Sequence, residues 1–368
     1  METSDRTPDG AFDSATADLV RAEYAGLDAG APYLNTATLG LLPARTATAL
    51  RAAVDAWAAG RPDTGGFEAA VVAARAAFGR ITGVPVERVA LASTVAGSVG
   101  LIAAQLPAGA EVVVADGDFS SLVHPFAART DLKLRIVPLE AVADAVRPGT
   151  ALVAVSAAQS ADGRVADLAA IRAAAAEHGA RTLLDGTQSV GWLPVCADDY
   201  DYLVCHAYKW LISPHGACFL TVRAGAEPTL SPAFAGWYAA DDPWTSCYGP
   251  IERLAPGARR FDARPAYLPF VGAAASLSLI EAVGVPALHA HGTALAARFR
   301  AGLTALGHTP VPAPFPTPIV AVPDLPAAAS PRLTAAAITH SARAGNLRFA
   351  FHLHNTPTDV ETALQALS

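Results

Sequence analysis

Residues 181–210 read RTLLDGTQSVGWLPVCADDYDYLVCHAYKW. This segment contains two short apolar runs, which predict strands at 182–185 and 202–205, with a helix-like stretch after the first. Polar residues follow both runs. Strands that are apolar on both faces are typical of a parallel sheet covered by helices on either side. The segment therefore predicts two neighbouring strands of an α/β sheet.

The same alternation of apolar runs and helical patterns extends over residues 60–260. Further strands are expected at 89–92, 111–115, 134–138, 151–156 and 217–222, and helices at 45–59, 67–82, 95–105, 120–129 and 166–178. In sheets of this kind, ligands bind beyond the carboxyl ends of the strands. The residues that follow each strand are therefore the candidates for a functional site.

The remaining sequence has a different pattern, which indicates a smaller α+β domain. It predicts helices at 270–283, 286–306, 332–343 and 357–367, strands at 318–322 and 347–353, and a proline-rich segment at 308–329. We expect a flexible tail at 1–15, a large domain at 16–265 and a small C-terminal domain at 266–368. Residues 16–45 are expected to pack partly with the small domain.

Composition excludes several classes of protein. The 368 residues are 52% hydrophobic and 16% charged, which excludes a disordered chain. The net charge is −7 and no basic block is present, so we expect no nucleic-acid partner. No apolar run reaches the roughly 20 residues that a membrane span needs. The four cysteines lack metal-ligand spacing, so we expect no metal site and reduced thiols in a cytoplasmic protein.

Lysine is rare in this chain. Of 26 basic residues only Lys133 and Lys209 are lysines, and the others are arginines. One interpretation is a compositional bias with two chance survivors. The other is that a remaining lysine acts as a neutral amine, which a guanidinium cannot do.

Four chemical features stand at the predicted strand ends. Lys209 supplies an amine that can form a Schiff base with an aldehyde. Asp185 supplies a carboxylate that can keep a pyridine nitrogen protonated. Thr94 and Ser98 lie at a strand-to-helix turn suited to a phosphate, and Phe119 supplies a ring that can stack on a cofactor. The molecule that needs all four features is pyridoxal 5′-phosphate.

These motifs resemble the class V aminotransferase family of fold-type I pyridoxal-phosphate enzymes, over residues 33–356. That family includes cysteine desulfurases, kynureninases, isopenicillin-N-epimerase-like proteins and C–S lyases. The resemblance implies a mostly parallel central sheet between helices in the large, cofactor-binding domain, with a smaller α+β C-terminal domain. Residues 184–189, LDGTQS, resemble the D-x-x-Q-S motif. By that resemblance Asp185 pairs with the pyridine nitrogen, and Gln188 bonds the phenolic oxygen of the cofactor.

The same resemblance assigns further cofactor contacts. Residues 206–210, HAYKW, resemble the segment that carries the Schiff-base lysine, so Lys209 takes that role. His206 and Tyr208 then fall where the family binds phosphate. The turn at 93–98 resembles the phosphate turn, which assigns Thr94 and Val95 to the cofactor. Phe119 lies in a kynureninase-like stretch, where an aromatic ring stacks on the cofactor.

The resemblance also assigns substrate contacts. Residues 348–356, RFAFHLHNT, resemble the R-x-S-x-x-x-Y-N-T motif, whose arginine clamps the substrate α-carboxylate. Arg348 inherits that role, and a planar guanidinium suits a carboxylate for independent physical reasons. Asn35, in the matching segment 33–37, is assigned to the substrate site. Trp237 is either a substrate contact or a buried structural residue.

Two departures from the family pattern narrow the prediction. Residues 311–347 contain no cysteine, which disfavours a persulfide-forming desulfurase, and Cys247 does not match the position of that thiol. The family commonly supplies a phosphate-binding threonine from a neighbouring subunit. Here residues 260–265, RFDARP, replace that motif, and Arg264 is a candidate substitute.

We expect a pyridoxal-phosphate enzyme that acts at the α-carbon of an amino acid through an external aldimine and a quinonoid. β-Elimination from a cysteine-derived substrate, as in a C–S lyase, is favoured because the relatives include many lyases. In addition, no second arginine for an acidic side chain is evident. Transamination is the main alternative, and epimerisation or a non-catalytic binder remain open. A homodimer is implied by the resemblance.

Overall fold

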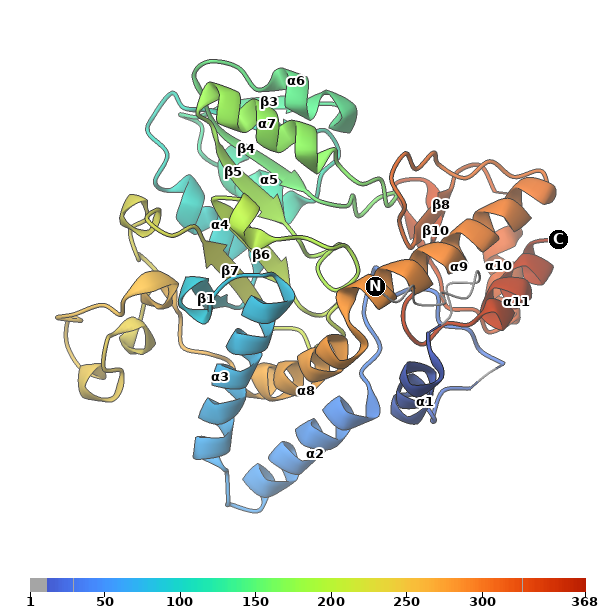
Figure 1. The fold of residues 1–368 in the computed structure, drawn as a ribbon, viewed down its shortest axis with the longest axis horizontal. Coiled ribbons are helices and arrows are strands. Elements are labelled where there is room, and N and C mark those ends of the chain that lie inside the picture. Colours follow the sequence, from blue (N-terminus) through green and yellow to red (C-terminus); the bar gives the residue numbers. More distant parts are fainter. Residues whose placement is uncertain (1–11, 29, 326) are drawn as a thin grey trace, which may run out of the picture.

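The computed structural model describes residues 12–28, 30–325 and 327–368. Its centre is a seven-stranded sheet (Figure 1). In spatial order the strands are β1 (Val89–Ala92), β7 (Cys218–Val222), β6 (Tyr202–His206), β5 (Arg181–Asp185), β4 (Thr150–Ser156), β2 (Glu111–Ala115) and β3 (Lys133–Val137).

The sheet is mostly parallel, as predicted. Only β7 runs against its neighbours, since it pairs antiparallel with both β1 and β6. The short connection between β6 and β7 explains this direction, because a parallel partner needs a crossover of a dozen or more residues. The carboxyl ends of β2, β4, β5 and β6 therefore meet at one edge.

Helices cover both faces of the sheet, which is why its central strands are buried along their length. One core contains apolar residues of α4 (Val95–Ala103) and α5 (Ser120–Ala127). The opposite core contains residues of α3 (Thr64–Ile81), α6 (Val142–Ala145), α7 (Leu168–His178) and α8 (Tyr267–Val283). Helix α2 (Ala44–Ala58) packs against α8.

A second, three-stranded antiparallel sheet lies apart from the first (Figure 1). Its order is β8 (Ile319–Val322), β10 (Asn346–Ala350) and β9 (Ser341–Arg343). Its core includes residues of α9 (Val285–Ala305), α10 (Ala329–Ala335) and α11 (Pro357–Leu367). The N-terminal segment joins this sheet through bridges from Tyr33 to Thr339 and from Asn35 to Ala350.

Helices α8 and α9 belong largely to different hydrophobic cores. Helix α8 contributes to the core of the large sheet, whereas much of α9 contributes to the core of the small one. We therefore propose a domain boundary near Gly284, rather than at residue 265.

Three predicted elements differ from the structure. No α-helix lies between β5 and β6, where only a short 3-10 helix, Ala197–Asp199, is present, because the loop after β5 is folded tightly against the β6–β7 connection. There Gly191 has a φ of 111°, and an added Cβ would lie 2.7 Å from the Trp210 carbonyl oxygen. The predicted helix 332–343 is α10 followed by β9, and Ala337 between them has a φ of 56°, which no α-helix contains. Strand β10 ends at Ala350, three residues earlier than expected.

Residues 1–11 of the predicted tail lie outside the described residues. Asp13 accepts a hydrogen bond from the Thr16 amide and so caps α1 (Ser14–Glu23), a helix that the sequence did not predict. No single described helix is long and apolar enough to span a membrane, and only α8 and α9 together, bent by 80° at their break, reach that length. The four cysteines are free thiols.

Candidate active site

A cavity of about 130 Å³ opens at the edge where the parallel strands end. Its walls combine hydroxyl, carboxyl, amide, imidazole, amine and aromatic groups. The lining residues are Thr94, Val95, Phe119, Ser121, Ser156, Ser160, Asp185, Thr187, Gln188, His206, Tyr208 and Lys209. The structure therefore brings all eight predicted cofactor-binding residues to one cavity.

Lys209 follows β6 and is 4% exposed. Its Nζ lies 5.4 Å from the ring centroids of both Phe119 and Tyr208, and it donates no hydrogen bond to any described residue. Burial lowers the pKa of this amine to about 8, against the opposing charge of Asp185. About a tenth of the amine is thus neutral at pH 7, far more than for an ordinary lysine, and this neutral form is the one that an amine nucleophile or base requires.

Asp185 ends β5, beside β6, and is 4% exposed. Burial raises the pKa of its carboxyl to about 6, and hydrogen bonds from Thr187 and the charge of Lys209 oppose that rise. The Thr187 amide donates to Oδ1 at 2.8 Å. A cationic partner inside the cavity would favour the ionised form of this carboxyl.

The N-terminus of α4 forms another wall. Thr94 is the N-cap, and its Oγ1 accepts a hydrogen bond from the Gly97 amide at 3.1 Å. The first amides of a helix have no partner within the helix, and the helix dipole favours an anion there. Thr94 and Val95 thus contribute a potential phosphate site.

His206 and Tyr208 lie on the β6 side of the cavity. The Gly216 amide donates to Nε2 of His206 at 3.0 Å, and burial lowers the pKa of this imidazole to about 4. The ring is therefore neutral at pH 7 and carries its proton on Nδ1. Tyr208 stacks on His215 with ring centroids 3.9 Å apart. These contacts hold both side chains in fixed orientations.

The Gln188 side chain is fixed by three hydrogen bonds. Its Nε2 donates to the Ala37 carbonyl oxygen at 2.9 Å and to Ser160 Oγ at 3.1 Å, while its Oε1 accepts from Trp210 Nε1 at 2.9 Å. The glutamine therefore ties the N-terminal segment and the Ser160 loop to the cavity wall.

Arg348 lies next to the cavity rather than on its wall. It is 1% exposed, and its guanidinium donates to the Ser160 carbonyl oxygen and, at 2.7 Å, to Thr38 Oγ1. Its Nε has no hydrogen-bond partner among the described residues. Burial lowers the pKa of Arg348 to about 10, so the group is cationic at neutral pH. Since Ser160 lines the cavity and accepts a hydrogen bond from Arg348, the guanidinium lies directly behind a residue of the cavity wall.

Three predicted site residues lie away from the lining. Asn35 pairs through its backbone with Ala350, and its Oδ1 is buried without a described hydrogen-bond partner. Trp237 contacts Tyr238 and Trp244. Arg264 is exposed, with its guanidinium 6.0 Å from the Tyr267 ring centroid. The substrate roles of Asn35 and Trp237 and the phosphate role of Arg264 stay predictions.

Four lining residues escaped the sequence analysis, namely Ser121, Ser156, Ser160 and Thr187. Two of them carried a usable signal. Ser156 is the last residue of β4 and Thr187 follows β5, so both stand at strand ends. Ser160 had no such signal, because the loop that contains it reaches the cavity only through its bonds to Gln188 and Arg348.

The family model described as aminotransferase class-V matches residues 65–321, more than half of the chain. The chain belongs to the class V aminotransferase family. It is 28% identical over 230 residues to the uncharacterized aminotransferase YcbU of Bacillus subtilis (strain 168), covering 59% of this chain and 60% of YcbU. It is 37% identical over 155 residues to the kynureninase of Stenotrophomonas maltophilia (strain K279a), covering 40% of this chain and 36% of that enzyme.

The fold is shared with solved structures. The cystine C–S lyase C-DES superposes with a TM-score of 0.83 at 23% identity, covering 94% of this chain and 98% of that one. In sequence, the chain spans less than two thirds of the length of the curated relatives named above.

The cofactor of class V aminotransferases is pyridoxal 5′-phosphate, and this cavity suits it. Lys209 supplies an amine that has no hydrogen-bond partner among the described residues and can react with an aldehyde. Asp185 supplies a buried carboxyl that suits a pyridine nitrogen. The α4 N-terminus suits a phosphate, and Phe119 suits ring stacking. The class V assignment thus agrees with the donor groups present in this chain.

Proposed function

We propose that this class V protein is a lyase that removes a β-substituent from a cysteine-derived amino acid. The observation that carries the proposal is Lys209, a buried amine of lowered pKa in a cavity shared with a buried acid. When bound, pyridoxal phosphate supplies an aldehyde and a ring that withdraws electrons from the substrate α-carbon.

Each residue then has a defined task. Asp185 would hold a positive charge at the pyridine nitrogen, Thr94 and Val95 would hold the phosphate, and Phe119 would stack on the ring. Arg348 binds the substrate α-carboxylate through its guanidinium and thereby orients the Cα–H bond. Lys209 Nζ would accept the α-proton, because its lowered pKa leaves part of the amine unprotonated and able to act as a base.

Elimination is supported by the lining of the cavity and by one structural relative. Lys209 is the only cation among the described lining residues. The cavity wall itself therefore offers no second cation for the acidic side chain of an amino-group donor or acceptor. C-DES, which shares the fold, is a cystine C–S lyase. Transamination is the second candidate, because YcbU is described as an aminotransferase.

We also propose that the protein is a homodimer. Large apolar side chains are exposed on α2 and on the segment before it, including Leu39, Leu42, Val54 and Trp57. Exposed apolar groups of this size are typical of a contact surface when they cluster. Sedimentation equilibrium of the holoprotein tests the dimer, and a monomer at micromolar concentration would contradict it.

The reaction is tested on the purified holoprotein with cysteine conjugates. Release of pyruvate and free thiol without an amino acceptor supports elimination. Stoichiometric conversion to the pyridoxamine form, with no pyruvate, would show transamination instead. A mixture with alanine and a keto acid provides the positive control for that second outcome.

A further inference from the structure

The hairpin of β9 and β10 places two arginines on one face. In its register Arg348 lies opposite Ser341 and Asn346 lies opposite Arg343. Side chains two residues apart on a strand, and side chains directly opposite across a ladder, share a face. Arg343 is therefore the diagonal neighbour of Arg348, toward the tip of the hairpin.

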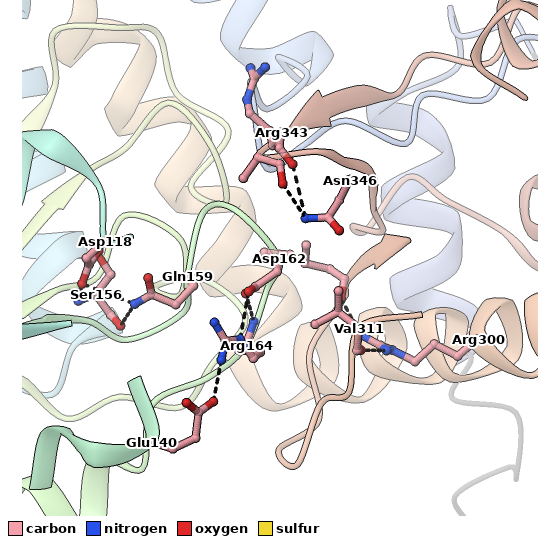
Figure 2. Close-up of polar contacts among 12 residues, drawn as sticks. Asp118, Glu140, Ser156, Gln159, Asp162, Arg164, Arg300, Val311, Arg343 and Asn346 are labelled. Carbon is pink, nitrogen blue, oxygen red and sulfur yellow. Dashed lines mark hydrogen bonds and ion pairs between the residues drawn. The ribbon is translucent and has the colours of Figure 1, made fainter. Parts of the chain in front are cut away.

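The turn that holds Arg343 is tight. Ala344 and Gly345 both have positive φ, at 47° and 81°, which is the conformation of a two-residue hairpin turn that matches strand twist. The Asn346 side-chain amide donates through Nδ2 to the carbonyl oxygens of Arg343 and Ala344 (Figure 2). The backbone of Arg343 is thus fixed.

The Arg343 side chain is exposed and forms no ion pair with any described carboxylate. Among the described residues, its guanidinium donates only to the Ala342 carbonyl oxygen, at 2.9 Å. In Figure 2 it extends away from Asn346, whereas the nearby Arg164 is paired with Asp162 and Glu140. Arg343 is thus a guanidinium free to bind an anion.

The charge of Arg343 acts on groups in and beside the cavity. Burial is the main cause of the lowered pKa of Lys209 and of Arg348, and the positive charge of Arg343 lowers both further. Burial raises the pKa of the Tyr208 hydroxyl, and the charge of Arg343 opposes that rise. Because Arg343 is the diagonal neighbour of Arg348 and not the same residue, it is available for a second anionic group of the substrate.

We propose that Arg343 binds a carboxylate on the substrate side chain, so that the substrate is a cysteine conjugate with an acidic β-substituent. This inference rests on the proposed function, which places the substrate α-carboxylate at Arg348. The second arginine was not evident from the sequence, because only the hairpin register aligns residue 343 with residue 348.

The test uses two substrates of equal length, S-(carboxymethyl)cysteine and the neutral S-(carbamoylmethyl)cysteine. Holoenzyme is titrated with each, and dissociation constants are taken from the change in cofactor absorption; kcat/KM for thiol release is measured in parallel. The variants are Arg343→Met, Arg343→Lys and the control Arg61→Met. Arg61 is also exposed and also bonds only a nearby carbonyl oxygen.

We expect the natural chain to bind the acidic conjugate about tenfold more tightly than the neutral one. Arg343→Met should abolish this preference, Arg343→Lys should retain part of it, and Arg61→Met should leave it intact. Added salt should weaken it. A preference that persists in Arg343→Met, or its absence from the natural chain, would overturn the inference.

The same measurements distinguish a failure of the anion site at Arg343 from a failure of the proposed elimination. If both conjugates bind without thiol release while the Arg343-dependent preference is present, elimination is wrong and the anion site stands. If thiol is released equally from both conjugates by every variant, elimination stands and the anion site is wrong.

Discussion

Asp185 and Lys209 line the same cavity, and each shifts the pKa of the other toward its charged form. Burial acts in the opposite sense on both groups and dominates, so the acid titrates at about 6 and the amine at about 8. This pairing comes from adjacent parallel strands, because Asp185 ends β5 and Lys209 follows β6.

Replacing the cavity lysine should remove both colour and turnover. We expect Lys209→Ala to lose the near-visible absorption of the bound aldehyde and to lower kcat by about 10²- to 10⁴-fold. Lys133→Ala is the matched control, since Lys133 is the only other lysine and is exposed on β3. Full turnover by Lys209→Ala would refute the assignment.

The acid at the end of β5 should be needed for chemistry more than for cofactor retention. Asp185→Asn keeps the shape but lacks the negative charge, so we expect kcat to fall about 10²- to 10³-fold while absorption persists. Asp116→Asn, at an exposed position just after β2, serves as control. Equal rates for the two variants would show that the Asp185 charge is not used.

The lowered pKa of Lys209 predicts a pH dependence of stability in the cofactor-free protein. Between about pH 8 and 10.5 the unfolded chain holds a proton on this amine that the folded chain has lost. Stability should therefore rise with pH across that window, relative to Lys209→Met, by up to a few kcal/mol. Urea unfolding at several pH values measures this difference. A Lys133→Met control should show no such rise, and a flat difference for Lys209→Met would contradict the burial of the amine.

Much of the large sheet and most of the site followed from the sequence. Short apolar runs set the strands of the seven-stranded sheet, and polar residues after them set Asp185 and Lys209. These signals are local, and the rule that ligands bind at strand ends shows where to look. The resemblance to the class V family, and not the pattern itself, assigned Val95, Gln188, His206 and Tyr208. The cofactor-binding set was therefore accessible without the structure.

The contacts that depend on long-range packing were not accessible. The antiparallel direction of β7 depends on the short return from β6, and the split of residues 332–343 depends on the φ of Ala337. Likewise, Ser160 reaches the site because Gln188 and Arg348 bond to it, not because of any pattern around it.

A buried ion pair supports the strand that leads to the α4 N-terminus. Arg75 is paired with Asp262, which is fully buried and also accepts from the Leu91 amide of β1 at 2.7 Å. Arg75→Met leaves that carboxyl without its cation, so we expect unfolding in urea to become easier by about 3–5 kcal/mol. Removing both charges in Arg75→Met/Asp262→Leu should recover part of the loss. Arg21→Met, which breaks an exposed pair with Asp18, should cost less than about 1 kcal/mol. A loss in Arg75→Met no larger than in Arg21→Met would show that the buried pair does not stabilise β1.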